Sequence, residues 1–72
     1  MSKTVEKFKQ GQVTAKVRKH MVDDQSVYTV KVTRPYMDKH GKVKHTTTLR
    51  HDDCTDASLL LAFANEFILT AP

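Results

Sequence analysis

The sequence predicts an α+β fold, in which three or four antiparallel β-strands are followed by one C-terminal α-helix packed on one face of the sheet (β-β-β-α). Between Gln12 and Arg50, apolar and polar residues alternate with a period of two, as in half-buried strands. From Ala57 onward, the apolar residues recur with a period of 3.6, as in an amphipathic helix. A chain of 72 residues has room for one such domain.

The first ten residues are mostly polar and charged, with Val5 and Phe8 as apolar anchors. We expect residues 1–10 to form a flexible basic tail, with a short edge strand or turn as the structured alternative. We expect residues 11–72 to form the single domain of sheet and helix.

Two strands follow Gly11. The first runs from Gln12 to Val22 and ends at a turn predicted for residues 23–26, because Asp and Ser side chains can bond their own backbone. The second runs from Val27 to Met37. Pro35 has no N–H to donate to a sheet, so it marks an edge, a bulge or the end of this strand.

A tight turn at residues 38–41, with glycine as its last residue, predicts a hairpin to a third strand from Lys42 to Arg50. In this strand we place Val43, His45, Thr47 and Leu49 on the apolar side. The Asp-rich segment at residues 51–56 then predicts the start of the helix, because Asp and Thr are good N-caps.

Positive charge is concentrated on one predicted face of the sheet. The chain has 12 Lys and Arg against 8 Asp and Glu, a net charge of +4. A small basic domain with its charges on one face is a candidate for binding a polyanion. The alternative is an ordinary solvated sheet face. That face is predicted to carry no acidic residue and to consist of Thr14, Lys16, Arg18, His20, Thr29, Lys31, Thr33, Lys42, Lys44, Thr46, Thr48 and Arg50.

On this interpretation, lysine and arginine contact phosphates, and hydroxyl groups bond phosphate oxygens. Tyr36, beside the hairpin turn, is the candidate for stacking on a base, with core packing as its alternative. The predicted nucleic-acid-binding residues are Lys16, Arg18, Lys31, Tyr36, Lys42, Lys44 and Arg50.

The helix has more apolar surface than one packed side requires. A main stripe of Ala57, Leu60, Leu61, Ala64, Phe67 and Ile68 can face the sheet. The apolar surface outside this stripe predicts a symmetric homodimer formed through the helix. The alternatives are that the N-terminal tail covers it or that these are scattered exposed side chains. The predicted interface residues are Leu59, Ala62, Phe63 and Leu69.

The segment from Tyr28 to Lys44 resembles a known family. The resemblance lies in an alternating strand, the residues Tyr36-Met37-Asp38, a turn with Gly41 and a return strand that contains lysine. It is similar to the DNA-binding core of the transcriptional coactivator positive cofactor four and its small bacterial and phage relatives. By order of elements the resemblance extends over residues 28–61. This chain has threonines at residues 46–48, where the family usually has glycines.

The resemblance implies a curved sheet, a helix that mediates dimerisation, and binding of single-stranded or melted DNA by residues of the sheet. Carried onto this chain, it implies roles for Arg18, Lys31, Lys42 and Lys44.

No catalytic or metal-binding chemistry is predicted. A structural zinc site needs four ligands in paired short spacings, and His45, His51 and Cys54 do not supply them. Cys54 and His51 lack an orienting third group and an oxyanion site, so no enzyme and no cofactor are expected. A lone cysteine and the absence of a long apolar run favour a cytoplasmic protein without a membrane span.

Two functions therefore stay open. The first is a small homodimeric nucleic-acid-binding protein that prefers single-stranded DNA and acts as an accessory factor in transcription or replication. The second is a protein–protein adaptor, or a small phage or plasmid inhibitor, that docks through the apolar helix and is steered by the basic face.

Overall fold

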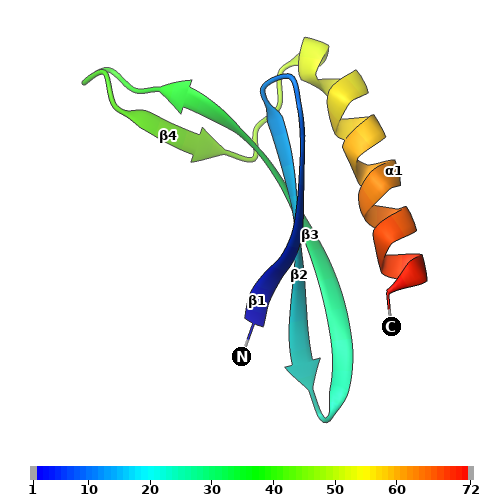
Figure 1. Cartoon of the computed structure of the whole chain (residues 1–72). Helices are drawn as coiled ribbons and strands as arrows, with labels where there is room; N and C mark the ends of the chain where they lie inside the picture. Colours follow the sequence, from blue (N-terminus) through cyan, green and yellow to red (C-terminus); the bar gives the residue numbers. More distant parts are fainter. Residues whose placement is uncertain (1, 72) are drawn as a thin grey trace.

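The computed structural model of the protein describes residues 2–71 and consists of one antiparallel sheet and one helix. The strands lie in the order β1-β2-β3-β4, and the helix α1 packs on one face of the sheet (Figure 1). This confirms the predicted fold class, with four strands. The elements are β1 (Ser2–Gln10), β2 (Val13–Val22), β3 (Gln25–Met37), β4 (Val43–Thr46), a 3₁₀ turn (His51–Asp53) and α1 (Cys54–Thr70).

Ser2–Gln10 is a strand, so the structured alternative considered for the N-terminal segment holds in place of the expected flexible tail. Ser2–Gln10 forms β1 and pairs along its length with β2. The register shifts between Thr4 and Glu6, so one residue bulges from the ladder there. This bulge breaks the period-two pattern of β1, which is why the sequence did not show a nine-residue strand.

Two short turns set the register of the first three strands. Gly11, in the β1–β2 turn, has a φ of +60°, and Asp23 and Asp24, in the β2–β3 turn, have φ values of +51° and +65°. Turns with positive φ match the right-handed twist of the strands they join, and Asp and Gly tolerate this conformation. The β2–β3 turn is thus shorter than predicted, and β3 begins at Gln25.

The core is small and lies between β2 and α1. Three side chains of β2 and three of α1 are buried, and Phe8, Val30, Val32 and Leu49 pack around them. Leu61, expected within the core stripe, is 47% exposed, so the helix buries a narrower stripe than predicted. The buried apolar residues are Val13, Ala15, Val17, Ala57, Leu60 and Ala64.

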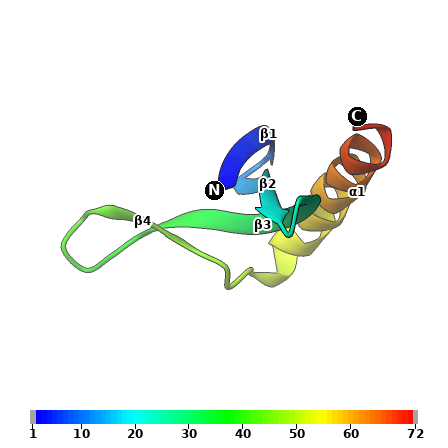
Figure 2. The same ribbon diagram turned by 90° about the horizontal axis from the view of Figure 1, so that it is seen from below.

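The end of β3 and β4 form an arm that leaves the sheet on the side opposite α1, as both views show (Figures 1 and 2). β4 spans only Val43–Thr46, so the predicted strand from Lys42 to Arg50 is too long. Residues 47–50 instead return to the helix, and Leu49 packs against the core.

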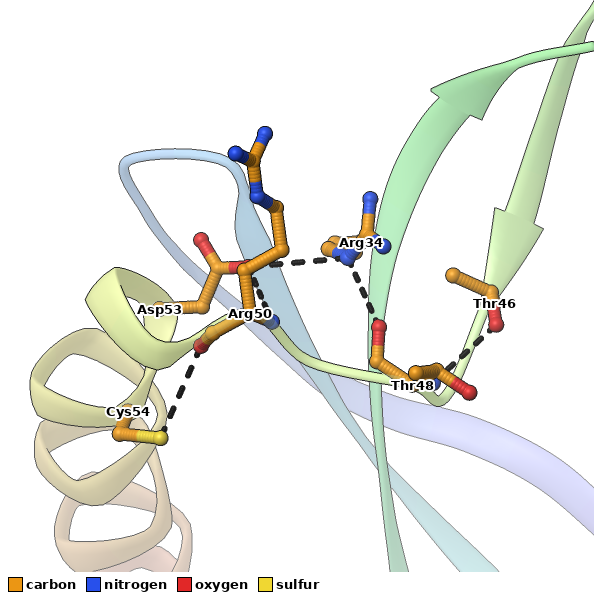
Figure 3. Close-up of polar contacts among 6 residues, drawn as sticks. All are labelled: Arg34, Thr46, Thr48, Arg50, Asp53 and Cys54. Carbon is orange, nitrogen blue, oxygen red and sulfur yellow. Dashed lines mark hydrogen bonds and ion pairs between the residues drawn. The ribbon is translucent and has the colours of Figure 1, made fainter.

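Arg34 and Asp53 hold this returning segment in place (Figure 3). The Nε of Arg34 donates to the carbonyl oxygen of Thr48 at 2.7 Å and lies 3.6 Å from Oδ2 of Asp53. The same Oδ2 accepts a hydrogen bond from the backbone N–H of Arg50 at 3.0 Å. One carboxylate therefore connects β3 to the start of the helical segment.

Candidate nucleic-acid interface

A basic groove lies on the open face of the sheet, opposite α1. It is a hollow of about 340 Å³ lined by residues from all four strands. We call this set the basic groove: Lys7, Thr14, Lys16, Arg18, Lys31, Thr33 and His45.

Strand register places three lysines in a single row across the sheet. Lys7 of β1 lies opposite Lys16 of β2, and Lys16 lies opposite Lys31 of β3. Neighbouring strands are about 4.8 Å apart, so the outer two lysine backbones are about 10 Å apart. Like charges directly opposite each other destabilise a sheet, so a row of three has an energetic cost.

Arg18 and two threonines extend the row along the strands. Arg18 lies opposite Thr29, one step of the face away from Lys16, and Thr14 lies opposite Thr33 on the other side of the row. The guanidinium of Arg18 donates to the Ser2 hydroxyl at 3.0 Å. The groove therefore presents ammonium, guanidinium and hydroxyl donors on one surface, the groups that contact phosphate and sugar oxygens.

No acidic side chain lines the basic groove. Within residues 2–71, the two ion pairs join Arg34 to Asp53 and Lys44 to Asp38, and neither uses a groove cation. The positive charge of the groove is therefore not neutralised by neighbouring carboxylates.

His45 brings the arm into the groove. It lies opposite Pro35 in the β3–β4 register, and so shares a face with Thr33 and Lys31. Its predicted position on the apolar side was wrong. The assignment assumed that Val43 faces the core, but Val43 is 63% exposed. Val43 pairs with Met37, which lies on the open face of the sheet, so Val43 and His45 lie on the open face and Lys44 lies on the opposite one.

Two predicted residues, Lys42 and Lys44, lie in the arm and not in the basic groove. Lys44 lies opposite Tyr36, and its Nζ is 3.4 Å from Oδ2 of Asp38. The backbone N–H of Lys42 donates to Oδ1 of Asp38 at 2.9 Å, and that of His40 donates to the same atom at 2.8 Å. These hydrogen bonds stabilise the charged form of Asp38 and lower its pKa below the ordinary value of 3.8, and the bond from Lys42 has the larger effect.

Tyr36 and Arg50, also predicted, line a second hollow together with Arg34, Gln12 and neighbouring residues. Tyr36 is 39% exposed and so is not a core residue, which removes the alternative considered for it. The structure thus brings together Lys16, Arg18 and Lys31, and separates them from the other four predicted binding residues.

Sequence reasoning missed Lys7 and His45 as groove residues. Lys7 was missed because the polar composition of residues 1–10 predicts a tail and gives no strand register. The sequence signal for this pairing is the Gly11-Gln12 turn, which lies between two segments that both contain apolar residues. A hairpin at this turn places Lys7 opposite Lys16. His45 was missed because its strand was assigned the wrong face.

The predicted dimer residues of α1 differ in their surroundings. Leu59 and Leu69 are 42% and 72% exposed, and Leu59 and Ala62 line a shallow hollow with Cys54, Thr55 and Ser58. Phe63 has a partner within the chain, because its ring centroid is 6.0 Å from that of Phe8. A folded N-terminal strand thus partly covers this side of the helix, and leaves Leu59 and Leu69 uncovered.

Within the described residues, no helix is long and apolar enough to cross a membrane, and no cluster of three His, Cys, Asp or Glu side chains could hold a metal ion. Comparison of the chain with protein-family models, with curated proteins and with solved structures found no match.

Proposed function

We propose that the protein binds nucleic acid through the basic groove, with single-stranded DNA as its preferred ligand. The observation that carries this proposal is the row of Lys7, Lys16 and Lys31, flanked by Arg18, on a face without acidic residues. Such a row destabilises the sheet when empty, and a phosphate backbone lying across it would remove that repulsion.

The shape of the groove supports a single strand over a duplex. The cationic row is three strands wide, and His45 of the arm lines the same hollow. A duplex is normally read by a helix or ribbon that enters one of its grooves. Within residues 2–71, α1 packs against the other face of the sheet, and β4 of the two-stranded arm contributes only His45 to the basic groove, so neither element carries the cationic row.

The resemblance to the positive cofactor four family adds support for a role in transcription or replication. In this proposal the protein acts as an accessory factor in the cytoplasm, where its single cysteine, Cys54, would stay reduced.

Charge reversal at the centre of the row tests the proposal. Lys16→Glu should weaken binding of a short labelled single-stranded DNA at low salt by about tenfold to a hundredfold, because it removes one phosphate contact and adds repulsion. Fluorescence anisotropy measures the dissociation constant.

Lys3→Glu is the matched control. Lys3 lies opposite Lys19, whose side of β2 is the helix side, so this variant has the same net charge as Lys16→Glu but leaves the groove intact. Equal losses for the two variants would mean that net charge, and not the groove, governs binding.

Exposed apolar residues on α1 favour a second function, a protein–protein adaptor that docks through the helix. Leu59 and Leu69 are the side chains concerned. The double variant Leu59→Gln and Leu69→Gln should leave DNA binding within about twofold if the groove is the functional site. Intact DNA binding together with loss of a protein partner would assign a separate docking role to the helix.

A further inference from the structure

We propose that residues 25–31 of β3 pair in antiparallel fashion with the same residues of a second copy of this chain. The inference goes beyond nucleic-acid binding and does not depend on it. β3 is the longest strand of the sheet, at 13 residues.

One edge of β3 is unpaired over this segment. β2 pairs with residues 25–33 on one side, but β4 pairs only with residues 34–37 on the other. The segment that returns to α1 crosses β3 next to Arg34, as its bond to Thr48 shows (Figure 3). Residues 25–31 are therefore left with an open edge, seen at the lower end of β3 in Figure 1.

The backbone groups that point out of this edge can be identified. Asp38 donates from its N–H to the carbonyl of Lys42 across the arm, so even-numbered residues of β3 direct their backbone groups towards β4. The two-residue turn at Asp23 and Asp24 gives the same result, because it makes Gln25 a bonded partner of Val22. Hence Ser26, Tyr28 and Val30 present free N–H and C=O groups.

The opposite edge of the sheet shows what a protected edge looks like. The outer strand β1 carries four charged residues, namely Lys3, Glu6, Lys7 and Lys9. A bulge also breaks its register. Lysines and bulges are the features that prevent strand addition. Residues 25–31 have a regular register, no proline and, apart from Lys31, no charge. A long unprotected edge of this kind is a site for adding a strand.

A second copy fits this edge because the pairing is self-complementary. In an antiparallel pair about a two-fold axis, the ends of the segment meet, so Lys31 lies near the uncharged Gln25 end of the copy and not near its own counterpart. Tyr28 and Val30 lie on the helix side, where Leu61 is 47% exposed. These are the apolar side chains that the pairing would cover.

The paired sheets would also join their open faces. Arg18 and Lys31 of both copies would then lie on one surface, and the nucleic-acid interface would extend across the two-fold axis. With six buried apolar residues within residues 2–71, the protein gains most from such an addition, since small domains bury too little surface to be stable alone.

Amide hydrogen exchange combined with sedimentation analysis tests the proposal on the unmodified protein. We expect a dimer, with the amides of Tyr28 and Val30 protected from exchange. The amide of Lys9, which points out of β1 by the same reasoning, should exchange freely. A monomer, or a dimer in which the Tyr28 and Val30 amides exchange as fast as that of Lys9, would overturn the proposal.

Two proline variants sharpen the test. Tyr28→Pro removes one outward N–H from each copy without touching the β2 ladder, and should weaken dimerisation by about tenfold to a hundredfold. Lys9→Pro makes the same change at the β1 edge and should leave dimerisation within about threefold. Equal effects of the two substitutions, in variants whose β2–β3 amides remain protected, would contradict pairing through β3.

Discussion

Lys16 is the residue on which the functional account depends most directly. It has a lysine opposite it on each neighbouring strand. An ordinary solvated face has no reason to keep three like charges in a row, whereas a phosphate-binding face does. The two interpretations therefore differ in what they predict for the empty protein.

Neutralising this position should stabilise the protein. Lys16→Gln is expected to raise the free energy of unfolding by about 0.2–1 kcal/mol at low salt, because it relieves repulsion with Lys7 and Lys31. The gain should shrink as salt screens the charges. Urea denaturation at two salt concentrations measures it. The control is Lys39→Gln, in the exposed turn of the arm, which should leave the free energy of unfolding unchanged. A lower free energy of unfolding in Lys16→Gln would contradict the expected repulsion.

Asp53 is the residue that joins the arm to the helix. Asp53 is 9% exposed, and its carboxylate accepts a hydrogen bond from the Arg50 N–H and lies beside Arg34. Asp53→Ala is expected to lower the free energy of unfolding by about 1–3 kcal/mol, since it leaves partly buried donors without an acceptor. Asp53→Asn keeps an acceptor oxygen and should cost less. Denaturant unfolding measures the free energy of unfolding of both variants. An equal loss in the two would show that the hydrogen bond from Arg50 contributes little.

At the scale of elements, the β3–β4 arm depends on one carboxylate, that of Asp38. Hydrogen bonds from Lys42 and His40 to its charged form lower its pKa in the folded protein. A lowered folded pKa means that the carboxylate stabilises the arm above its unfolded pKa, about 4, and that this contribution is lost as the pH falls through the folded value.

We therefore expect the arm to lose order in acid before the rest of the sheet does. Chemical shifts of Gly41 and Lys42 should move with the titration of Asp38, at a pH below 3.8. Asp38→Ala should remove this transition. A midpoint above 3.8, or an unchanged transition in the variant, would contradict the role given to Asp38.

The elements also show where sequence patterns are informative and where they fail. β2, β3 and α1 were predicted well because each buries one regular face, so their apolar period is visible. β1 was expected only as a short alternative to a flexible tail, because its bulge breaks that period. β4 was assigned the wrong face because the arm extends beyond the helix and buries neither side fully, so its apolar residue Val43 gave a misleading register.

The same limits explain how much of the candidate site was predictable. Lys16, Arg18 and Lys31 lie on well-patterned strands, so the sequence placed them together correctly. The contributions of Lys7 and His45 depend on the β1 and β4 registers, which are set by tertiary pairing. The separation of Lys44 depends on the same register, because its contact with Asp38 forms within the arm.

At the scale of the whole molecule, the fold divides its two faces between two tasks. One face of the sheet packs against α1 and holds the small core. The other face, together with His45 of the arm, lines the basic groove. The helix and the arm extend in opposite directions from the sheet (Figure 2). The side chains that line the basic groove include no acidic residue, as predicted for this face, but the set of cations differs from the prediction. β1 adds Lys7, whereas Lys42, Lys44 and Arg50 lie outside the groove.

Four groove cations, Lys7, Lys16, Arg18 and Lys31, give the account its central quantitative claim. Each phosphate neutralised on a single strand contributes about −0.7 to the slope of log affinity against log salt, so the expected slope is about −3.

The most direct test is therefore fluorescence anisotropy of a short labelled single-stranded DNA across a salt series, with the matched duplex measured in parallel. We expect a slope near −3 and weaker binding of the duplex. A slope near zero, no binding at low salt, or equal binding of the duplex would contradict it.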